Sequence, residues 1–128
     1  MAQVEGEALV LRLVAGGRLL ALPMQATGEI FELARENLTV VGSLPPGVLG
    51  LVNWRGRPLW VLALAHLTGH LPAVTARLRL VLVRSGDALA AIAVDGVEGV
   101  FPAEEGGEVL DPKRLFDPSC WGVQAANP

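Results

Sequence analysis

Short apolar segments, separated by glycine or proline at nearly regular spacing, are the feature that most constrains how this chain can fold. Each segment has the length of a strand, about five to seven residues. Turn sequences between the segments, such as Gly16-Gly17 and Ser85-Gly86-Asp87, predict hairpins. Many short strands with even spacing are typical of a small β-barrel or β-sandwich. We therefore expect a mainly all-β fold with only short helical turns.

The pattern predicts strands over nine ranges, which are 8–14, 18–22, 29–33, 38–41, 51–53, 58–62, 77–84, 88–94 and 97–101. Short helical turns are expected between 23 and 28, from 47, and over 63–67. Asp111-Pro112 predicts a short helix over 112–116, because Asp caps a helix and Pro suits its first position. Residues 117–128 form a tail beyond this helix, and we expect it to be frayed over 119–128, where the sequence has little periodicity.

The length of 128 residues fits one domain over 1–128. The composition is 52% hydrophobic and 18% charged, which is apolar for a soluble domain. Two explanations are open: an unusually complete core, or apolar surface that awaits a partner. The net charge of −3 argues against a nucleic-acid partner, which would require a basic patch.

The cysteine count and the N-terminus indicate the compartment. Cys120 is the one cysteine, so an internal disulfide is excluded and a reducing compartment is favoured. The acidic start of the chain lacks the basic region of a signal peptide, and the uncharged run over 58–76 is interrupted by His, Gly and Pro. We expect a cytoplasmic protein that does not insert into a membrane.

A weak internal similarity, called the internal echo below, relates two parts of the sequence that lie about 70 residues apart. Segments 16–21 and 86–90 both follow an apolar strand, and both lead to an apolar pair with phenylalanine, Ile30-Phe31 and Val100-Phe101. Two similar barrel-like halves would explain the echo. Chance similarity between hydrophobic hairpins would explain it almost as well.

No motif supports catalysis, a cofactor or a metal, and we expect the protein not to be an enzyme. His66 and His70 have the spacing of two metal ligands on one helical face, but no carboxylate follows them closely. Cys120 has no partner motif, and the cluster of Glu104, Glu105 and Glu108 reads as a solvated loop. The chain has no phosphate-binding loop and no Ser–His–Asp arrangement.

The segment Asn53-Trp54-Arg55-Gly56-Arg57 is different, because it places Trp and Arg in a turn between two apolar strands. A turn that only reverses the chain could use Asn-Gly, whereas Trp and Arg are enriched at the anchoring points of protein interfaces. Two readings are open: an ordinary solvated hairpin, or a docking tip whose two arginines project together. Trp60 follows on the next strand, and we expect it in the core.

Residues 50–62 resemble the CheW family of chemotaxis coupling proteins, whose pattern at this place reads roughly G-V-I-N-L-R-G-x-V-x-P-V-I-D-L. Glu29-Ile30 is similar to the E-I pair of the family, and Val94-Asp95-Gly96-Val97 is similar to its V-D-x-V signature. The resemblance extends over residues 8–116.

The resemblance implies two small, SH3-like, five-stranded β-barrels in a single CheW-like domain, with sequence halves at 8–67 and 76–116. It implies a non-enzymatic adaptor that couples the cytoplasmic tip of chemoreceptors to the regulatory domain of a CheA-type histidine kinase, in chemotaxis or twitching motility. Such an adaptor would be recruited from the cytoplasm to membrane-associated receptor arrays. The matching positions Asn53, Arg55 and Gly56 would bind partners, and Val52, Val94 and Val97 would belong to the cores.

Three departures from the family pattern mark the chain as atypical. Ala63 replaces the acidic residue of V-I-D-L, and Trp54 replaces the usual leucine before Arg55. After Glu105–Glu108 the chain passes directly to the closing segment 109–116, where typical members carry another strand pair and a second loop. The second barrel is therefore expected to be incomplete, and an open sheet edge would favour self-association.

Two other functions fit the strand pattern. A small-molecule-binding β-barrel would use the apolar excess to line a pocket. An oligonucleotide-binding barrel would need a basic face and aromatic stacking positions, and three Phe, three Trp, no Tyr and a net charge of −3 argue against it.

Overall fold

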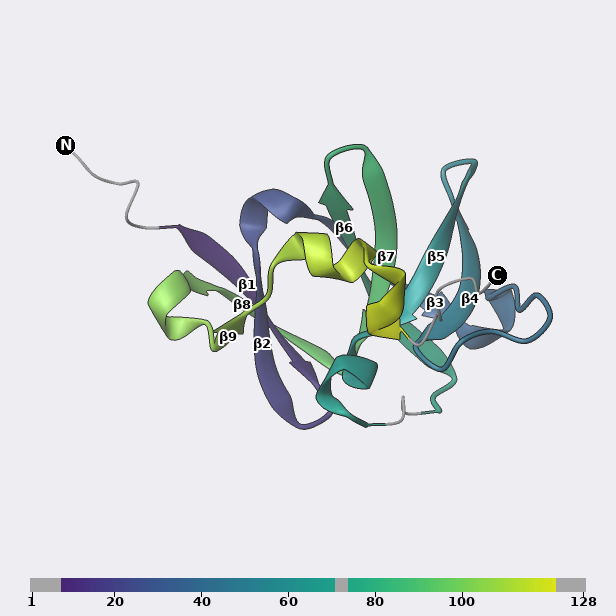
Figure 1. The fold of residues 1–128 in the computed structure, drawn as a ribbon, viewed down its shortest axis with the longest axis horizontal. Helices are drawn as coiled ribbons and strands as arrows, with labels where there is room; N and C mark the ends of the chain where they lie inside the picture. The colour runs from purple at the N-terminus through teal and green to yellow at the C-terminus, as the bar shows by residue number, and fades with distance from the viewer. Residues whose placement is uncertain (1–7, 71–73, 122–128) are drawn as a thin grey trace, which may run out of the picture.

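Two curled sheets form the fold, which the computed structural model describes over residues 8–70 and 74–121. One sheet has the strand order β8-β1-β2-β9 and the other the order β3-β6-β7-β5-β4 (Figure 1). The all-β expectation is confirmed. The strands of the described residues are β1 (Leu9–Ala15), β2 (Arg18–Pro23), β3 (Thr27–Ala34), β4 (Val48–Trp54), β5 (Arg57–Ala63), β6 (Arg77–Ser85), β7 (Ala88–Val94), β8 (Gly96–Pro102) and β9 (Glu108–Val109).

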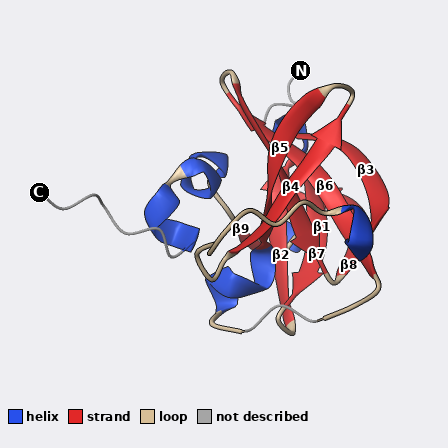
Figure 2. Ribbon diagram, turned by 90° about the vertical axis from the view of Figure 1, so that its right-hand side faces the viewer, coloured by secondary structure: helices blue, strands red, loops and turns tan. Residues whose placement is uncertain are grey.

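Short 3-10 helices connect the strands and lie at the margins of the sheets (Figure 2). None of the helices in the described part of the chain has the length and apolar character needed to cross a membrane. The helices are η2 (Met24–Ala26), η3 (Arg35–Asn37), η4 (Leu64–Thr68), η5 (Ala103–Glu105), η6 (Pro112–Phe116) and η7 (Pro118–Trp121). The expected helix over 112–116 is confirmed, and the Asp111 side chain caps it by accepting from the Lys113 amide at 3.0 Å.

Each sheet takes strands from both halves of the sequence. β1 pairs antiparallel with β8, and β3 pairs antiparallel with β6. The five-stranded sheet curls until the segment after β3 meets β4, where Thr39 and Leu51 exchange two backbone hydrogen bonds of 2.9 and 2.8 Å. Of the strand expected over 38–41, this single bridge is all that forms.

Two apolar cores explain the wholly apolar run of β6. Leu80 and Leu82 face the interior of the five-stranded sheet, whereas Val81 and Val83 face the core between the two sheets. A strand that is buried on both faces has no polar alternation to preserve. Val52 lies in the first of these cores and Val94 in the second; Val97 is half-buried against the second.

The expectation for Trp60 is wrong, because its side chain is 47% exposed. Its neighbours Leu59 and Val61 point into the five-stranded sheet and are 2% and 0% exposed. Alternation along a strand therefore turns Trp60 to the outer face. There it lines an open apolar cleft together with Phe116 and Trp121.

The expected frayed tail is wrong as far as Trp121, and residues 122–128 lie outside the described part. Trp121 is 2% exposed within the core between the sheets, and its indole Nε1 donates to the Leu115 carbonyl at 2.9 Å. Trp121 fixes this segment to the core, and one buried side chain produces no periodic pattern in the sequence that could have predicted it. The helical turn expected from 47 is also absent, since β4 begins at Val48.

The internal echo corresponds to a repeated topology. On the outer side of its first strand, the hairpin β1–β2 pairs with the later strand β8, and the hairpin β6–β7 pairs with the earlier strand β3. On the outer side of their second strand each pairs in parallel, β2 with β9 and β7 with β5. The four-stranded sheet has a β9 of only two residues and no counterpart of β4 among the described residues.

Gly106, in the segment that leads into β9, packs closely against β1 and β2. A Cβ at Gly106 would overlap Val10 Cγ2 and lie 3.3 Å from Ala21 Cβ. Val10 and Ala21 are 2% and 0% exposed, so the glycine backbone covers them closely.

We expect Gly106→Ala to lower the free energy of unfolding by about 1–3 kcal/mol, because the added methyl group overpacks a filled site. Gly96→Ala is the matched control, since its Cβ would meet only Val14 Cβ at 3.9 Å. Urea denaturation measures both. Equal effects of the two substitutions would contradict the close packing at Gly106.

Glu32 links β3 to β6 through two arginines, and these contacts lower the pKa of its carboxyl group. Its carboxylate accepts from Arg79 Nη2 and Arg77 Nε, each at 3.0 Å. The hydrogen bond from Arg79 and then that from Arg77 lower the pKa of Glu32 below its ordinary value of 4.5. A lowered pKa contributes stability above the pKa of the unfolded chain, and this contribution is lost as pH falls through the folded pKa.

We therefore expect Glu32→Gln to lower the melting temperature at neutral pH and to have no effect in acid below the folded pKa of Glu32. Thermal unfolding followed across pH measures the difference between variant and wild type. Added salt should reduce the neutral-pH difference, because the ion pairs are exposed. A difference that is independent of pH would contradict this role of the carboxylate.

Candidate functional site

The turn between β4 and β5 consists of Arg55 and Gly56, both with positive φ, 52° and 78°. Positive φ at both central residues is the signature of a type I′ hairpin turn, where Asn-Gly is favoured. Arg55 is the one non-glycine residue with positive φ in the described part of the chain. Asn53 supports the turn, since its Oδ1 accepts the Gly56 amide at 2.8 Å.

Trp54 lies beside the turn and not within it, which corrects the sequence interpretation. It is the last residue of β4, pairs with Arg57 across the ladder, and packs half-buried against the core of the five-stranded sheet. The Arg55 guanidinium lies over its ring, with Cζ 4.8 Å from the ring centroid. Trp54 is thus a fixed aromatic platform under a cation.

Glu29 on β3 holds both side chains. One oxygen, Oε1, accepts from Trp54 Nε1 at 3.1 Å and from Arg55 Nη2 at 3.2 Å. The Arg55 side chain is still 72% exposed, so this ion pair orients the guanidinium more than it stabilises the fold. In the sequence Glu29 stands out only as part of the E-I pair, and its contact with the turn could not be predicted, because β3 and the turn are distant in sequence.

An open cleft of about 470 Å³ lies between this turn and the tip of the β6–β7 hairpin. Arg55, Arg57 and Arg84 line it, together with Glu29 and Asp87. Arg57 Nη2 donates to the Asp87 carbonyl at 3.5 Å. The structure therefore brings Arg55 and Arg57 to the same cleft and adds Arg84, for which the sequence carries no signal.

The charges of the cleft favour groups that accept hydrogen bonds. Glu29 is engaged by Arg55 and Trp54, and neither Arg57 nor Arg84 has an ion pair with a carboxylate among the described residues. A guanidinium can fork onto a carboxylate or onto backbone carbonyls. The cleft can therefore bind acidic side chains or the exposed carbonyls of another protein.

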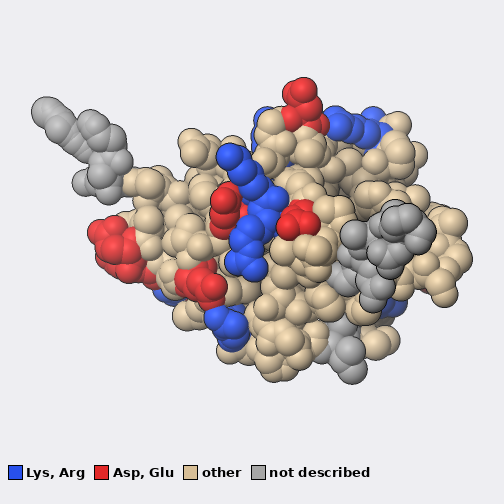
Figure 3. Space-filling view, in the orientation of Figure 1, with Lys and Arg blue, Asp and Glu red and all other residues tan. Residues whose placement is uncertain are grey.

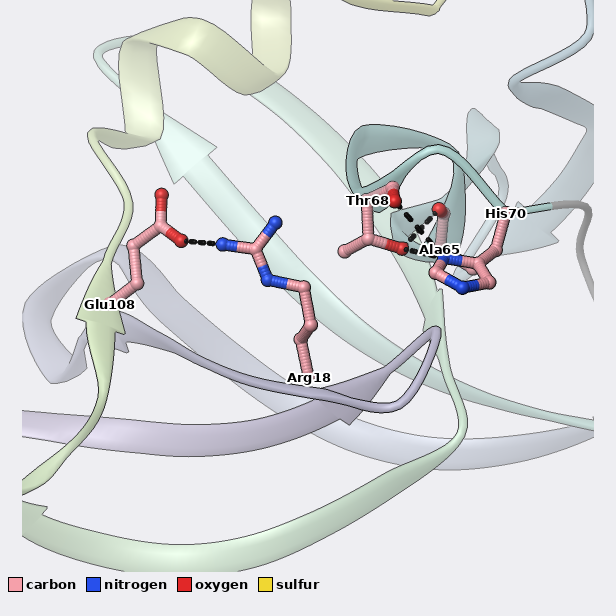
Figure 4. A network of polar contacts seen from close by, with 5 residues as sticks. All are labelled: Arg18, Ala65, Thr68, His70 and Glu108. Carbon is pink, nitrogen blue, oxygen red and sulfur yellow. Dashed lines mark hydrogen bonds and ion pairs between the residues drawn. The ribbon is translucent and has the colours of Figure 1, made fainter.

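The other candidates from the sequence have structural roles. His66 stacks on Trp121 with ring centroids 6.4 Å apart, and His70 Nδ1 lies 2.9 Å from Thr68 Oγ1 (Figure 4). Cys120 is half-buried on η7. Residues 8–70 and 74–121 contain no group of three or more His, Cys, Asp or Glu placed to hold a metal ion.

Comparisons with known proteins agree with the geometry. The family model described as CheW-like domain matches residues 9–106. Among solved structures, the scaffolding protein TtCheW from Thermoanaerobacter tengcongensis matches with a TM-score of 0.66 and 21% identity, over 75% of this chain and 65% of that chain. The chain thus spans just under two thirds of that protein, and the likeness concerns the fold. No curated protein matches the sequence.

We expect Arg55→Asn to leave the free energy of unfolding unchanged or slightly higher. Removing a long side chain from the left-handed region relieves about 1 kcal/mol, and losing the exposed ion pair with Glu29 costs about 0.5 kcal/mol. Arg55→Val, a β-branched residue at the same φ, should destabilise by about 1–2 kcal/mol. Urea denaturation measures both, and a large loss for Arg55→Asn would contradict the assigned strain.

Proposed function

Because the chain belongs to the family of CheW-like domains, we propose that it is a non-enzymatic adaptor that couples chemoreceptors to a CheA-type histidine kinase. The turn Asn53–Arg57 is the proposed partner-binding element. The kinase regulatory domain and the receptor cytoplasmic tip are the proposed partners, at receptor arrays reached from the cytoplasm.

The position of Arg55 is the observation that carries this proposal. It stands at positive φ in a type I′ turn, where Asn or Gly would form the same turn without strain. Strained positions of this kind occur at functional sites because the surrounding structure holds them. Here Trp54 and Glu29 hold the guanidinium in a largely exposed place.

The other residues of the turn support the same role. Asn53 and Gly56 set the backbone through their hydrogen bond. Trp54 anchors the platform, and Arg57 forms the next part of the cleft. Trp and Arg are the side chains that most often dominate binding energy at protein interfaces. The turn therefore offers a rigid, preorganised contact rather than a flexible loop.

A small-molecule-binding barrel is the second candidate, and one observation favours it. The apolar cleft beside Trp60 has a volume of about 350 Å³ and is lined without charged residues, by Leu62, Leu89, Phe116 and Trp121 among others. This volume falls within the range of ligand sites. A ligand of this cleft would bind equally well to wild type and to variants of Arg55.

A pull-down of the receptor tip and the kinase regulatory domain from the same organism tests the adaptor role. We expect both to be retained by wild type and Arg55→Glu to weaken binding by about tenfold or more. The matched control is Arg114→Glu, an exposed arginine on η6. Failure of wild type to retain either partner would contradict the adaptor role, and equal binding by Arg55→Glu would contradict the role of the turn.

A further inference from the structure

The outer edge of β9 corresponds to a sheet edge that is covered elsewhere in the molecule. Within the repeated topology, β9 lies on β2 as β5 lies on β7, both in parallel. The five-stranded sheet continues beyond β5 with β4, which pairs antiparallel. Beyond β9 the described residues supply no further strand.

The pairing register identifies equivalent side chains. Ala21 of β2 pairs with Val109, and the equivalent Ala91 of β7 pairs with Val61. Val61 is 0% exposed, because β4 lies on its other side, with Gly50 opposite. Val109 is 45% exposed. The same position in the same topology is thus buried in one sheet and uncovered in the other.

Leu19 shows the same difference on the neighbouring strand. It is 44% exposed, whereas its equivalent on β7, Leu89, is half-buried against the core of its sheet. Leu19 and Val109 share one face of the four-stranded sheet, since both alternate with residues that face the other core. The chain that leads into β9 covers Val10 and Ala21 with Gly106 but leaves these two side chains exposed.

The other edge of this sheet, on β8, is protected against strand addition. Its pairing with β1 shifts register near Gly99, which has a φ of +122°, and the strand ends at Pro102. Bulges and proline are features that blunt sheet edges. The strand β9 has neither.

The charges around β9 indicate what kind of segment would fit. Figure 3 shows acidic side chains at the end of the molecule formed by η5 and β9. Glu108 pairs with Arg18 (Figure 4). Glu104 and Glu105 are exposed, and no ion pair engages them within residues 8–70 and 74–121.

We propose that the outer edge of β9 is a strand-acceptor site for an extended segment of another protein in which apolar residues alternate with lysine or arginine. The segment pairs antiparallel with Glu108–Val109, as β4 pairs with β5. Its apolar side chains cover Val109 and Leu19, and its basic side chains face Glu104 and Glu105. Main-chain hydrogen bonds to a sheet edge supply affinity in this binding mode, and alternate side chains supply selectivity.

Nuclear magnetic resonance of the labelled chain, titrated with a short synthetic peptide of alternating valine and lysine, tests the site. We expect saturable shifts at Leu19, Glu108 and Val109. A peptide of alternating valine and glutamate, and a lysine peptide with proline at its central positions, should cause none. Val109→Lys should weaken binding by about tenfold, the loss of one buried valine contact. The matched control Val40→Lys, at a side chain 64% exposed after β3, should bind as wild type.

Three results would overturn the proposal: no saturable shift, shifts of equal size with the proline peptide, or equal binding by Val109→Lys. Light scattering at several protein concentrations tests whether a second copy of this chain covers the edge. A dimer that Val109→Lys abolishes would show that a second copy covers the edge, and would contradict a foreign strand. These outcomes are independent of the Arg55 turn, which lies on the other sheet.

Discussion

Pairing between strands from opposite ends of the sequence is the constraint on which the rest of the structure depends. β1 pairs with β8, and β3 pairs with β6, so neither half of the sequence can form its sheet from its own strands alone. Isolated hairpins are marginal in water, and their stability here comes from the core that the two sheets share. Leu13 and Leu22 from one sheet, and Val83 and Ile92 from the other, are part of this core.

The same pairing makes the Arg55 turn rigid. β5 is held between β4 and β7, and Glu29 reaches the turn from β3. A turn on such a support can keep an arginine at positive φ, where an isolated hairpin would relax. Backbone strain at one residue, in a fold whose other local features agree with one another, is expected at a functional site. The four-stranded sheet differs, because residues 8–70 and 74–121 give it no counterpart of the β4–β5 hairpin that carries this turn in the other sheet.

Most strand positions followed from the sequence because apolar segments and turn residues agree there; the exceptions are the range 38–41, which forms only one bridge, and β9, which was not predicted. β6–β7 and the Asp111 cap are the clearest cases. The resemblance to the CheW family is confirmed by the family match over residues 9–106. The exchange of strands between the halves could not be deduced, because local patterns carry no information on which distant strands pair.

The errors have the same cause. Trp60 belongs to an apolar run, but the register of β5 turns it outward, and register depends on neighbours in space. Trp121 belongs to a segment without periodicity, yet it is buried in the core between the sheets, so no local pattern indicated its burial. At the site, Arg55 and Arg57 were visible in the turn, whereas Glu29 and Arg84 join them only through tertiary structure.

Amide hydrogen exchange of the chain, alone and bound to the kinase regulatory domain, tests the docking role of the turn most directly. We expect protection on binding at residues 54–57 and at the facing β6–β7 tip, residues 84–88, with little change across the core strands. A complex that forms while residues 54–57 exchange as fast as in the free chain would contradict that role.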